Sequence, residues 1–317
     1  MISKLSKKQI LVLKLLENHK KPLSAYKILD SLREHGFNVE LMHVPHIPIK
    51  NLKNLSFSFF GSLKAITNSK TYDAVHAWNV PSAFIMKKIK AKKKILSVHG
   101  VYSKQVDMLH SKLTSSIINS KESEVLDWAD TLTTDSKFVQ SEYAKLGKFF
   151  EYIPAPLDSN KFKNIPSSEK KNQIVYVGRD SFEKGIDILR NIETKLNASV
   201  KYCTNLDWDE AMKIVKESKI LIVPSRTESI PQVIKEAFFL KIPVIATNVG
   251  GIPELISDNI TGLLIPPENP NQMIDTINML LEDEETQDKL AKNGFEFITR
   301  NFSWDVLIDK YKNLYKT

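Results

Sequence analysis

The stretch "KILIVPSRTESIPQVIKEAFFLKIPVIATN" (219–248) shows the organisation of the chain most clearly. An apolar run, a short loop, an amphipathic segment and a second apolar run follow one another, the pattern of a strand–helix–strand unit. Pro231 suits the first position of the helix, because its missing N–H would have no partner there. The cap position then falls on Ile230, which has no side-chain acceptor. The first-turn amides near Gln232 are therefore expected to bind a phosphate or sugar oxygen.

Two glutamates accompany this helix start. Glu228 lies just before the helix and Glu236 projects from its second turn. Carboxylates repel phosphate, so the expected targets of both side chains are the paired hydroxyls of a ribose or a pyranose. The segment "LDWDEAMKIV" contains the Asp-x-Asp pattern of a metal site at 207–209, but it precedes a predicted helix. We interpret Asp207 and its neighbour Glu210 as a capping box and expect no metal.

The cations that a phosphate needs are found in "VGRDSFEKG" (177–185). A predicted buried strand ends at Gly178, whose missing side chain allows close backbone approach. Arg179 and Lys184 then flank a short loop that opens a helix, and both could reach one diphosphate. Taken alone this motif is weak, because an arginine at a strand end and a lysine in a loop are more often ordinary surface residues.

Apolar, β-rich runs alternate with amphipathic segments along most of the 317 residues, which predicts βαβ units on parallel sheets. The length suggests two domains, with a linker in the Pro-, Ser- and Lys-rich segment 152–172. Such a protein binds its ligand at a point where the strand order reverses or between the domains. A dinucleotide dehydrogenase is excluded, because the first glycine of the chain is Gly36 and no Gly-x-Gly-x-x-Gly or Walker loop is present. One cysteine, Cys203, excludes an internal disulfide and a cysteine-based metal site.

The two halves differ in charge. Residues 1–160 hold 24 Lys and Arg against 14 Asp and Glu, whereas the remainder holds 21 against 23. Segment 50–70 combines phenylalanines with lysines, and "MKKIKAKKK" (86–94) adds six more lysines. This pattern fits either a helix that lies on an anionic membrane or a core helix with a solvated lysine face. No nucleic-acid-binding module is visible. We interpret the N-terminal segment as a first strand and expect a cytoplasmic protein, with peripheral contact at the inner face of the membrane.

Several segments together resemble the retaining glycosyltransferases of family 4. "VGRDSFEKGIDIL", "VPSRTESIPQVIKEAFFLKIPVIATNVGGIPELI" and "TGLLIPP" are similar to the C-terminal half of that family, in order from about 173 to 310. The first half resembles it less closely, through "DAVHAWNVPSA", "ILSVHG" and "WADTLTTDS". The resemblance implies a GT-B fold, which is an α/β fold of two Rossmann-like doubly wound domains facing across a cleft. The implied parts are an acceptor domain at 1–160, a donor domain at 161–300 and a C-terminal helix at 301–317 that returns to the first domain.

The resemblance also implies roles for individual residues. Arg179 and Lys184 would neutralise the diphosphate of a UDP- or GDP-linked sugar, Glu236 would accept from the ribose, and Glu228 would contact the transferred sugar. His99 is expected to act with Glu228 in catalysis. Further expected contacts are Gly178, Ile230, Pro231 and Gln232 to the donor, and Trp78 and Ser136 to the sugar or acceptor. No cofactor or metal is implied.

The chain departs from the family pattern at several places, one of which is a shortened strand–helix unit before "LDWDEAMKIV". The glycine-rich loop after the first strand is missing, and Trp78 replaces the second histidine of a His-x-His motif that begins at His76. Lys241 stands where the family has a glycine that ends a helix. The resemblance predicts transfer of a sugar to a glycan, a lipid-linked or another hydroxyl acceptor in polysaccharide or glycolipid biosynthesis. Two alternatives stay open: a nucleotide-sugar epimerase of the same fold, and a non-catalytic sugar-nucleotide-binding or scaffold protein.

Overall fold

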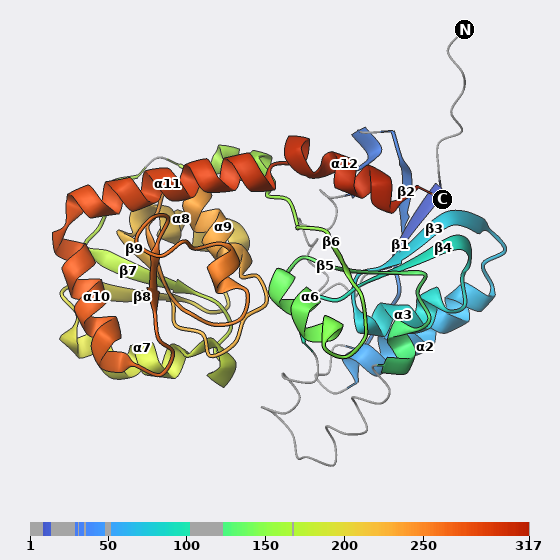
Figure 1. Cartoon of the computed structure of the whole chain (residues 1–317), viewed down its shortest axis with the longest axis horizontal. Coiled ribbons are helices and arrows are strands. Elements are labelled where there is room, and N and C mark those ends of the chain that lie inside the picture. The colour runs from blue at the N-terminus through green and yellow to red at the C-terminus, as the bar shows by residue number, and fades with distance from the viewer. Residues whose placement is uncertain are drawn as a thin grey trace, which may run out of the picture. The chain divides into compact units, whose positions relative to one another are not determined.

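The computed structural model describes residues 9–13, 29–30, 32–34, 36–47, 52–101, 123–166 and 168–316. The chain divides into two compact units (Figure 1). Unit 1 consists of Met1–Asp135, Val139–Pro154 and Ile308–Thr317, and unit 2 of Ser136–Phe138 and Ala155–Leu307. The C-terminal segment therefore completes the unit that the N-terminal half builds.

Unit 1 contains a six-stranded parallel sheet in the order β2-β1-β3-β4-β5-β6. The central strands read as apolar runs because helices and loops cover both faces of a parallel sheet. The strands are β1 (Gln9–Leu13), β2 (Asn38–Leu41), β3 (Thr71–Ala77), β4 (Lys90–Ser97), β5 (Thr131–Thr134) and β6 (Glu151–Tyr152). Its helices with given bounds are α2 (Lys53–Ile66) and α3 (Val80–Met86), together with most of α6 (Lys137–Ala144) and of α12 (Trp304–Leu314), whose first residues belong to unit 2.

Unit 2 contains a five-stranded parallel sheet in the order β11-β10-β9-β7-β8. Its strands are β7 (Gln173–Val177), β8 (Ser199–Cys203), β9 (Ile220–Val223), β10 (Val244–Thr247) and β11 (Leu263–Ile265). Its helices are α7 (Ile186–Ile192), α8 (Trp208–Glu217), α9 (Gln232–Phe239), α10 (Pro270–Glu282) and α11 (Glu284–Phe302). Short 3-10 helices lie at η1 (Ser159–Asn164), η2 (Phe182–Lys184), η3 (Glu193–Lys195) and η4 (Ile252–Glu254).

Alternate residues of the unit 2 strands supply two separate cores, as period-2 side-chain alternation requires. Val175, Leu221 and Val244 pack with α8, α9 and the end of α11 on one face. Ile174 and Ile222 pack with α7 and α10 on the other. Figure 1 shows these two groups of helices on opposite sides of β7, β8 and β9. Both units thus have the predicted doubly wound α/β architecture.

The end of the chain is anchored in unit 1 through a buried histidine. His76 of β3 is 3% exposed, and its Nδ1 lies 2.7 Å from the hydroxyl of Tyr315 and 2.9 Å from the indole nitrogen of Trp78. Its Nε2 lies 2.7 Å from the Ser97 hydroxyl. Burial lowers the pKa of His76 to about 3, so the ring is neutral. Because the indole N–H must donate to Nδ1, the ring proton belongs on Nε2. His76 is therefore bonded within the end of the sheet.

Some elements differ from the sequence-based prediction. The apolar pattern of the sequence predicts a strand from 94, whereas β4 begins at Lys90, because the exposed residues Lys90 and Lys92 precede the run that is buried from Ile95 onward. α6 was not predicted, and β6 and η1 lie in the segment interpreted as a linker. The amphipathic pattern also predicts a helix at 112–129, most of which lies outside the described residues.

Lys241 has φ 57°, so it occupies the left-handed position that ends α9. The amides of Lys241 and Ile242 donate to the carbonyls of Phe238 and Ala237, closing the two-bond C-terminal motif that usually carries glycine. The ammonium of Lys241 lies 4.8 Å from the ring centre of Phe295 on α11, a contact that offsets part of the backbone strain. Among the described residues, no helix is long and apolar enough to cross a membrane.

Candidate donor-binding site

The candidate site is built at the carboxyl ends of β7 and β9. These strands are neighbours in the sheet, and the strand order reverses between them, since β8 lies on one side and β10 and β11 on the other. Loops that leave such a point diverge to opposite faces of the sheet and leave room for a ligand. The loop after β7 carries Arg179 and Lys184, and the loop after β9 carries Arg226 and Glu228.

Lys184 and Glu228 form a pair that joins the two loops. The Lys184 Nζ donates to Glu228 Oε1 at 2.6 Å, and the Ser225 hydroxyl donates to the same oxygen at 3.0 Å. The side chains of Lys184 and Glu228 are 22% and 10% exposed. The structure thus brings together two of the predicted site residues that lie 44 positions apart in sequence.

Gly185 sets how closely the two loops approach. It has φ 66°, and a Cβ at this position would overlap the carbonyl oxygen of Pro224. Its amide donates to Phe182 at 3.1 Å, closing the 3-10 turn η2 directly before α7. Because only glycine fits both the backbone angle and the space, this residue holds Lys184 beside the β9 loop.

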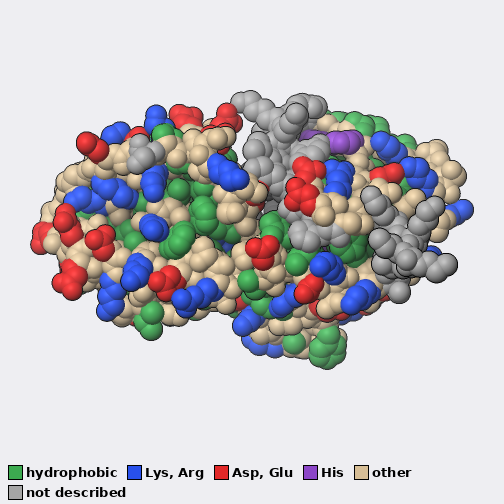
Figure 2. All heavy atoms as spheres, turned by 90° about the horizontal axis from the view of Figure 1, so that it is seen from above, with side chains coloured by type: hydrophobic (Ala, Val, Ile, Leu, Met, Phe, Trp, Pro, Cys, Tyr) green, Lys and Arg blue, Asp and Glu red, His purple; other side chains and the backbone are tan. Residues whose placement is uncertain are grey.

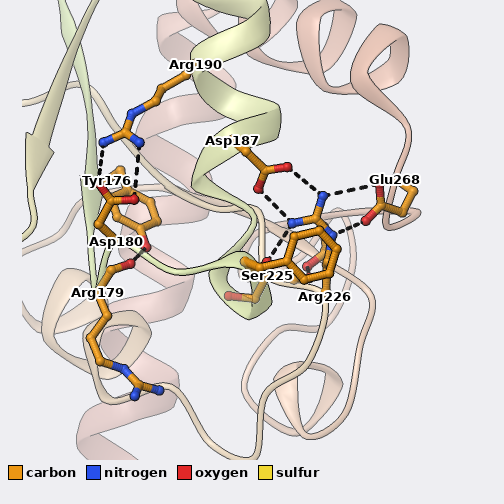
Figure 3. A network of polar contacts seen from close by, with 10 residues as sticks. Tyr176, Arg179, Asp180, Asp187, Arg190, Ser225, Arg226 and Glu268 are labelled. Atoms are coloured by element: carbon orange, nitrogen blue, oxygen red, sulfur yellow. Dashed lines mark hydrogen bonds and ion pairs between the residues drawn. The ribbon is translucent and has the colours of Figure 1, made fainter. Parts of the chain in front are cut away.

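Arg226 ties the two loops together from a second side (Figure 3). Its guanidinium donates to both carboxylate oxygens of Asp187, at 2.7 and 2.8 Å, and also pairs with Glu268, which follows β11. It further donates to the Phe182 carbonyl at 2.5 Å and lies 3.8 Å from the Phe182 ring centre. These bonds raise the pKa of Arg226, and the hydrogen bond from Arg226 lowers the pKa of Asp187. Arg226 therefore fixes the η2 turn that carries Lys184.

Arg179 has a fixed backbone and a solvated side chain. The Tyr176 hydroxyl donates to the Arg179 carbonyl at 2.6 Å, and burial raises the pKa of Tyr176, so the phenol stays protonated. The Arg179 side chain is 76% exposed and pairs with Glu183 at 3.0 Å. Nearby, Arg190 holds Asp180 through two hydrogen bonds (Figure 3). Gly178 lies directly after β7, at the base of this loop.

The start of α9 differs by one residue from the prediction. Pro231 is the N-cap rather than the first helical residue, which is Gln232. Pro231 adopts an extended backbone, with ψ 114°, and its carbonyl accepts from the Ile234 amide. Ile230 instead packs into the core with 8% exposure. As predicted, the N-cap residue makes no side-chain capping hydrogen bond, although the residue at that position is Pro231 and not Ile230.

Glu236 has a different partner from Glu228. It accepts from the indole N–H of Trp208 at 2.8 Å. Burial raises the pKa of Glu236, an effect that the Trp208 hydrogen bond and the charge of Lys161 oppose. Asp207 is the N-cap of α8, and its carbonyl accepts from Ala211, but its side chain makes no capping hydrogen bond. The predicted helix start is right and the predicted capping box is wrong, because the Asp207 side chain does not turn back to the helix amides.

Each of the three residues predicted to contact the sugar or the acceptor interacts with another side chain of the protein. His99 is half exposed, and its Nδ1 lies 3.2 Å from Asp135. The hydroxyl of Ser136, which belongs to unit 2, donates to Glu254 at 2.8 Å. Trp78 is 8% exposed and donates to His76. Roles of these three side chains toward a sugar, like the donor-binding roles of the other predicted residues, stay predictions.

Three residues of this region were not singled out from the sequence: Trp208, Arg226 and Tyr176. Arg226 could have been found, because a cation directly after a buried strand lies at the edge where ligands bind. Trp208 gave no such signal, since its position before a predicted helix suggested only a helix start. Among the residues described, no group of three or more His, Cys, Asp and Glu side chains could hold a metal ion. Metal independence stays a prediction.

Comparison with known proteins shows which proteins the chain is similar to. Residues 191–297 match the family model of glycosyl transferases group 1. The chain is 26% identical to an uncharacterized glycosyltransferase of Methanocaldococcus jannaschii, MJ1178, over 90% of this chain and 88% of that protein. Its fold is similar to that of sucrose-phosphate synthase from Thermosynechococcus elongatus, with a TM-score of 0.78, 17% identity and 98% of each chain covered.

A second similar structure is that of Anabaena Alr3699/HepE in complex with UDP and glucose. The TM-score is 0.73 at 17% identity, with 97% of this chain and 99% of that chain covered. At such identity the two structural matches establish the fold, whereas the sequence matches carry the enzyme class. Together with the two doubly wound sheets, they show that the chain carries a glycosyl transferases group 1 domain and is a glycosyltransferase with the GT-B fold.

Proposed function

We propose that this glycosyltransferase is a retaining enzyme of family 4 that uses a nucleotide-diphosphate sugar as donor. The observation that carries the proposal is the Lys184–Glu228 pair at the strand-order reversal, beside Arg179 and the uncapped start of α9. Together these groups offer cations and amide N–H groups for a diphosphate and a carboxylate for sugar hydroxyls.

The donor would exchange partners within the site. A diphosphate oxygen would attract the Lys184 ammonium, and Glu228, relieved of that bond, would accept from the hydroxyls of the sugar. The Ser225 hydroxyl, 3.0 Å from the carboxylate, would hold Glu228 in place during this change. Glu236 would accept from the ribose in place of the Trp208 N–H, with which it now bonds at 2.8 Å.

In the transfer step the bond between the anomeric carbon and the phosphate oxygen breaks, and its electron pair leaves with the nucleoside diphosphate. The acceptor hydroxyl oxygen forms the new bond from the same face, and its proton passes to the departing phosphate oxygen. Lys184 and Arg179 stabilise the charge that develops on the leaving group, which is the largest charge change in the reaction. This scheme requires no protein base and retains the anomeric configuration.

We propose a uridine diphosphate sugar as the donor to test first, because the similar Anabaena structure was obtained with UDP and glucose. The acceptor is proposed to be a hydroxyl of a glycan or a lipid-linked glycan, in polysaccharide or glycolipid biosynthesis. The lipid-linked case is supported by the lysine-rich first half of the chain.

A thermal-shift screen across UDP-, GDP- and ADP-sugars tests the donor, since a ligand that binds only the native state raises the melting temperature. Nucleotide release is then measured with and without acceptors. Release that depends on an acceptor supports transfer, whereas isomerised donor without an acceptor would identify an epimerase. A shift in melting temperature without turnover of any kind would point to a binding protein and contradict the proposal.

Lys184→Ala and Glu228→Ala are expected to abolish transfer while leaving the fold intact, because each removes a direct contact to the donor. A loss on the order of 100-fold or more in kcat/KM is expected for each variant. Lys289→Ala and Glu285→Ala are matched controls, since both residues are exposed on α11. Full activity of either site variant would show that the donor binds elsewhere.

A further inference from the structure

The outward face of α2 is a continuous apolar stripe. Leu52, just before the helix, is followed by Leu55, Phe59, Leu63 and Ile66 at spacings of three or four residues, which places all five on one side. Each is between 45% and 69% exposed. We call these five residues the α2 stripe. The adjacent Phe60 is 38% exposed and packs edge-on against Phe59, with ring centres 5.5 Å apart.

The opposite face of α2 already provides the contacts that hold the helix. Phe57, Gly61 and Ala65 are buried, and a Cβ on Gly61 would overlap the side chain of Ile85 in α3. The Ser58 hydroxyl donates to the Pro81 carbonyl at 3.0 Å, which fixes the same interface. A surface helix normally has one apolar face toward the core and a polar face toward water. α2 is apolar on both, so the α2 stripe is not needed to anchor the helix.

The segment of the sequence that contains the stripe is strongly basic. Between positions 41 and 101 the sequence has a single acidic residue, Asp73, which pairs with Lys92 at 2.7 Å. The same segment has ten lysines, at positions 50, 53, 64, 70, 87, 88, 90, 92, 93 and 94. By contrast, the face of the molecule in Figure 2 carries acidic and basic side chains mixed together. An exposed apolar patch of this extent indicates an interaction surface, and the lysines indicate an anionic partner.

We propose that the α2 stripe docks on the surface of an anionic lipid membrane. Phe59 and Leu63 would enter the boundary between headgroups and acyl chains, and the lysines would lie at the lipid phosphates. Docking of a second copy of this chain is disfavoured, because a symmetric contact would place the two lysine-rich surfaces against each other. The inference deepens the proposed function, since an enzyme bound in this way meets a lipid-linked acceptor where that acceptor lies.

Co-sedimentation of the full chain with vesicles tests the proposal. The vesicles contain either phosphatidylcholine alone or phosphatidylcholine mixed with phosphatidylglycerol. Binding is expected only to the anionic vesicles and is expected to weaken as salt is added. The variant Phe59→Ser/Leu63→Ser should bind at least about tenfold more weakly, because both side chains would leave the lipid boundary. Lys88→Gln/Lys90→Gln should weaken binding by about fivefold per lysine.

Phe149→Ser is the matched control for the apolar change. Phe149 belongs to unit 1 and is 81% exposed, but it lies between α6 and β6, away from the stripe. The Phe149→Ser variant should bind to the vesicles as strongly as the unaltered chain does. Equal binding of the stripe variant, or equal binding to both kinds of vesicle, would overturn the proposal.

Light scattering tests the other candidate partner of the stripe, a second copy of this chain. If the unaltered chain does not bind vesicles but is a dimer that the stripe variant converts to a monomer, the stripe joins two copies and the membrane proposal is wrong. A thermal-shift measurement of the stripe variant with the donor tests the proposed function independently of membrane binding. Donor binding is expected to be unchanged, because no residue of the stripe belongs to the donor site.

Discussion

At the scale of single residues, Glu236 links stability to pH. Burial raises the pKa of its carboxyl above the ordinary value of about 4.3, so the folded chain binds this proton more tightly than the unfolded chain. The resulting stabilisation is fully present below the ordinary pKa and is lost as the pH rises through the raised pKa. Near neutral pH the folded protein therefore contains a partly buried carboxylate at a cost in free energy of unfolding.

Glu236→Gln should therefore melt at the same temperature as the unaltered chain in acid and at a higher temperature near neutral pH. The glutamine keeps the shape of the side chain and can still accept from the Trp208 N–H, but it does not ionise. The measurement is the melting temperature of both proteins across this pH range. Glu285→Gln, at an exposed position of α11, is the control for the exchange of a carboxyl group for an amide. A difference that is the same at every pH would contradict the assigned burial cost.

At the scale of elements, the turn η2 depends on Gly185. Gly185→Ala should destabilise the protein and weaken donor binding, because the new Cβ would push the turn and Lys184 away from Pro224. Gly147 offers a matched control, since it has φ 72° but no atom within 4 Å of a Cβ at that position. Gly147→Ala carries the same kind of backbone strain, about 1 kcal/mol, without the overlap.

The comparison of these two alanine variants isolates the packing of the two loops. Denaturant unfolding should show a loss of free energy of unfolding at least about 1 kcal/mol larger for Gly185→Ala. Only this variant should lose the donor-induced shift in melting temperature. An equal loss of free energy of unfolding in the two variants would show that the close approach of the loops does not contribute to stability. An unchanged donor-induced shift in the melting temperature of Gly185→Ala would show that this approach does not contribute to donor binding.

At the scale of the whole molecule, the last residues of the chain hold unit 1 together. Tyr315 is fully buried against His76, its ring centre lies 5.7 Å from that of Phe37, and the Lys93 ammonium donates to the Leu314 carbonyl at 2.8 Å. Unit 1 is therefore incomplete until the C-terminus has been synthesised, even though its sheet is encoded at the start of the chain.

Tyr315→Ala should destabilise unit 1 by about 3 kcal/mol, as expected for the cavity left by a large buried side chain. Tyr315→Phe, which removes the hydroxyl and its hydrogen bond to His76 but keeps the ring, should cost about 1 kcal/mol. Hydrogen exchange should then show faster exchange in β3 and β4 of the alanine variant and unchanged protection in β7 and β9. Val306→Ala, at an exposed position of α12, serves as the control. An equal loss of protection against hydrogen exchange in both units would contradict the conclusion that Tyr315 stabilises unit 1 alone.

The sequence by itself determined the class of the fold. Parallel strands buried on both faces require uninterrupted apolar runs, so strands such as Ile220–Val223 and Val244–Thr247 could be located from the sequence alone. It also located the main candidate side chains, because Arg179, Lys184 and Glu228 follow such runs closely, and the carboxyl ends of parallel strands meet at one edge.

Only the tertiary structure decided which of these side chains meet. The bond between Lys184 and Glu228 and the bond between Trp208 and Glu236 join residues 44 and 28 positions apart, and local patterns carry no information on such pairs. The same holds for α2, since helical periodicity gives its two apolar faces but not which of them the protein covers. Packing made that choice, because Gly61 allows close approach to α3 on one side only, and this leaves the α2 stripe exposed.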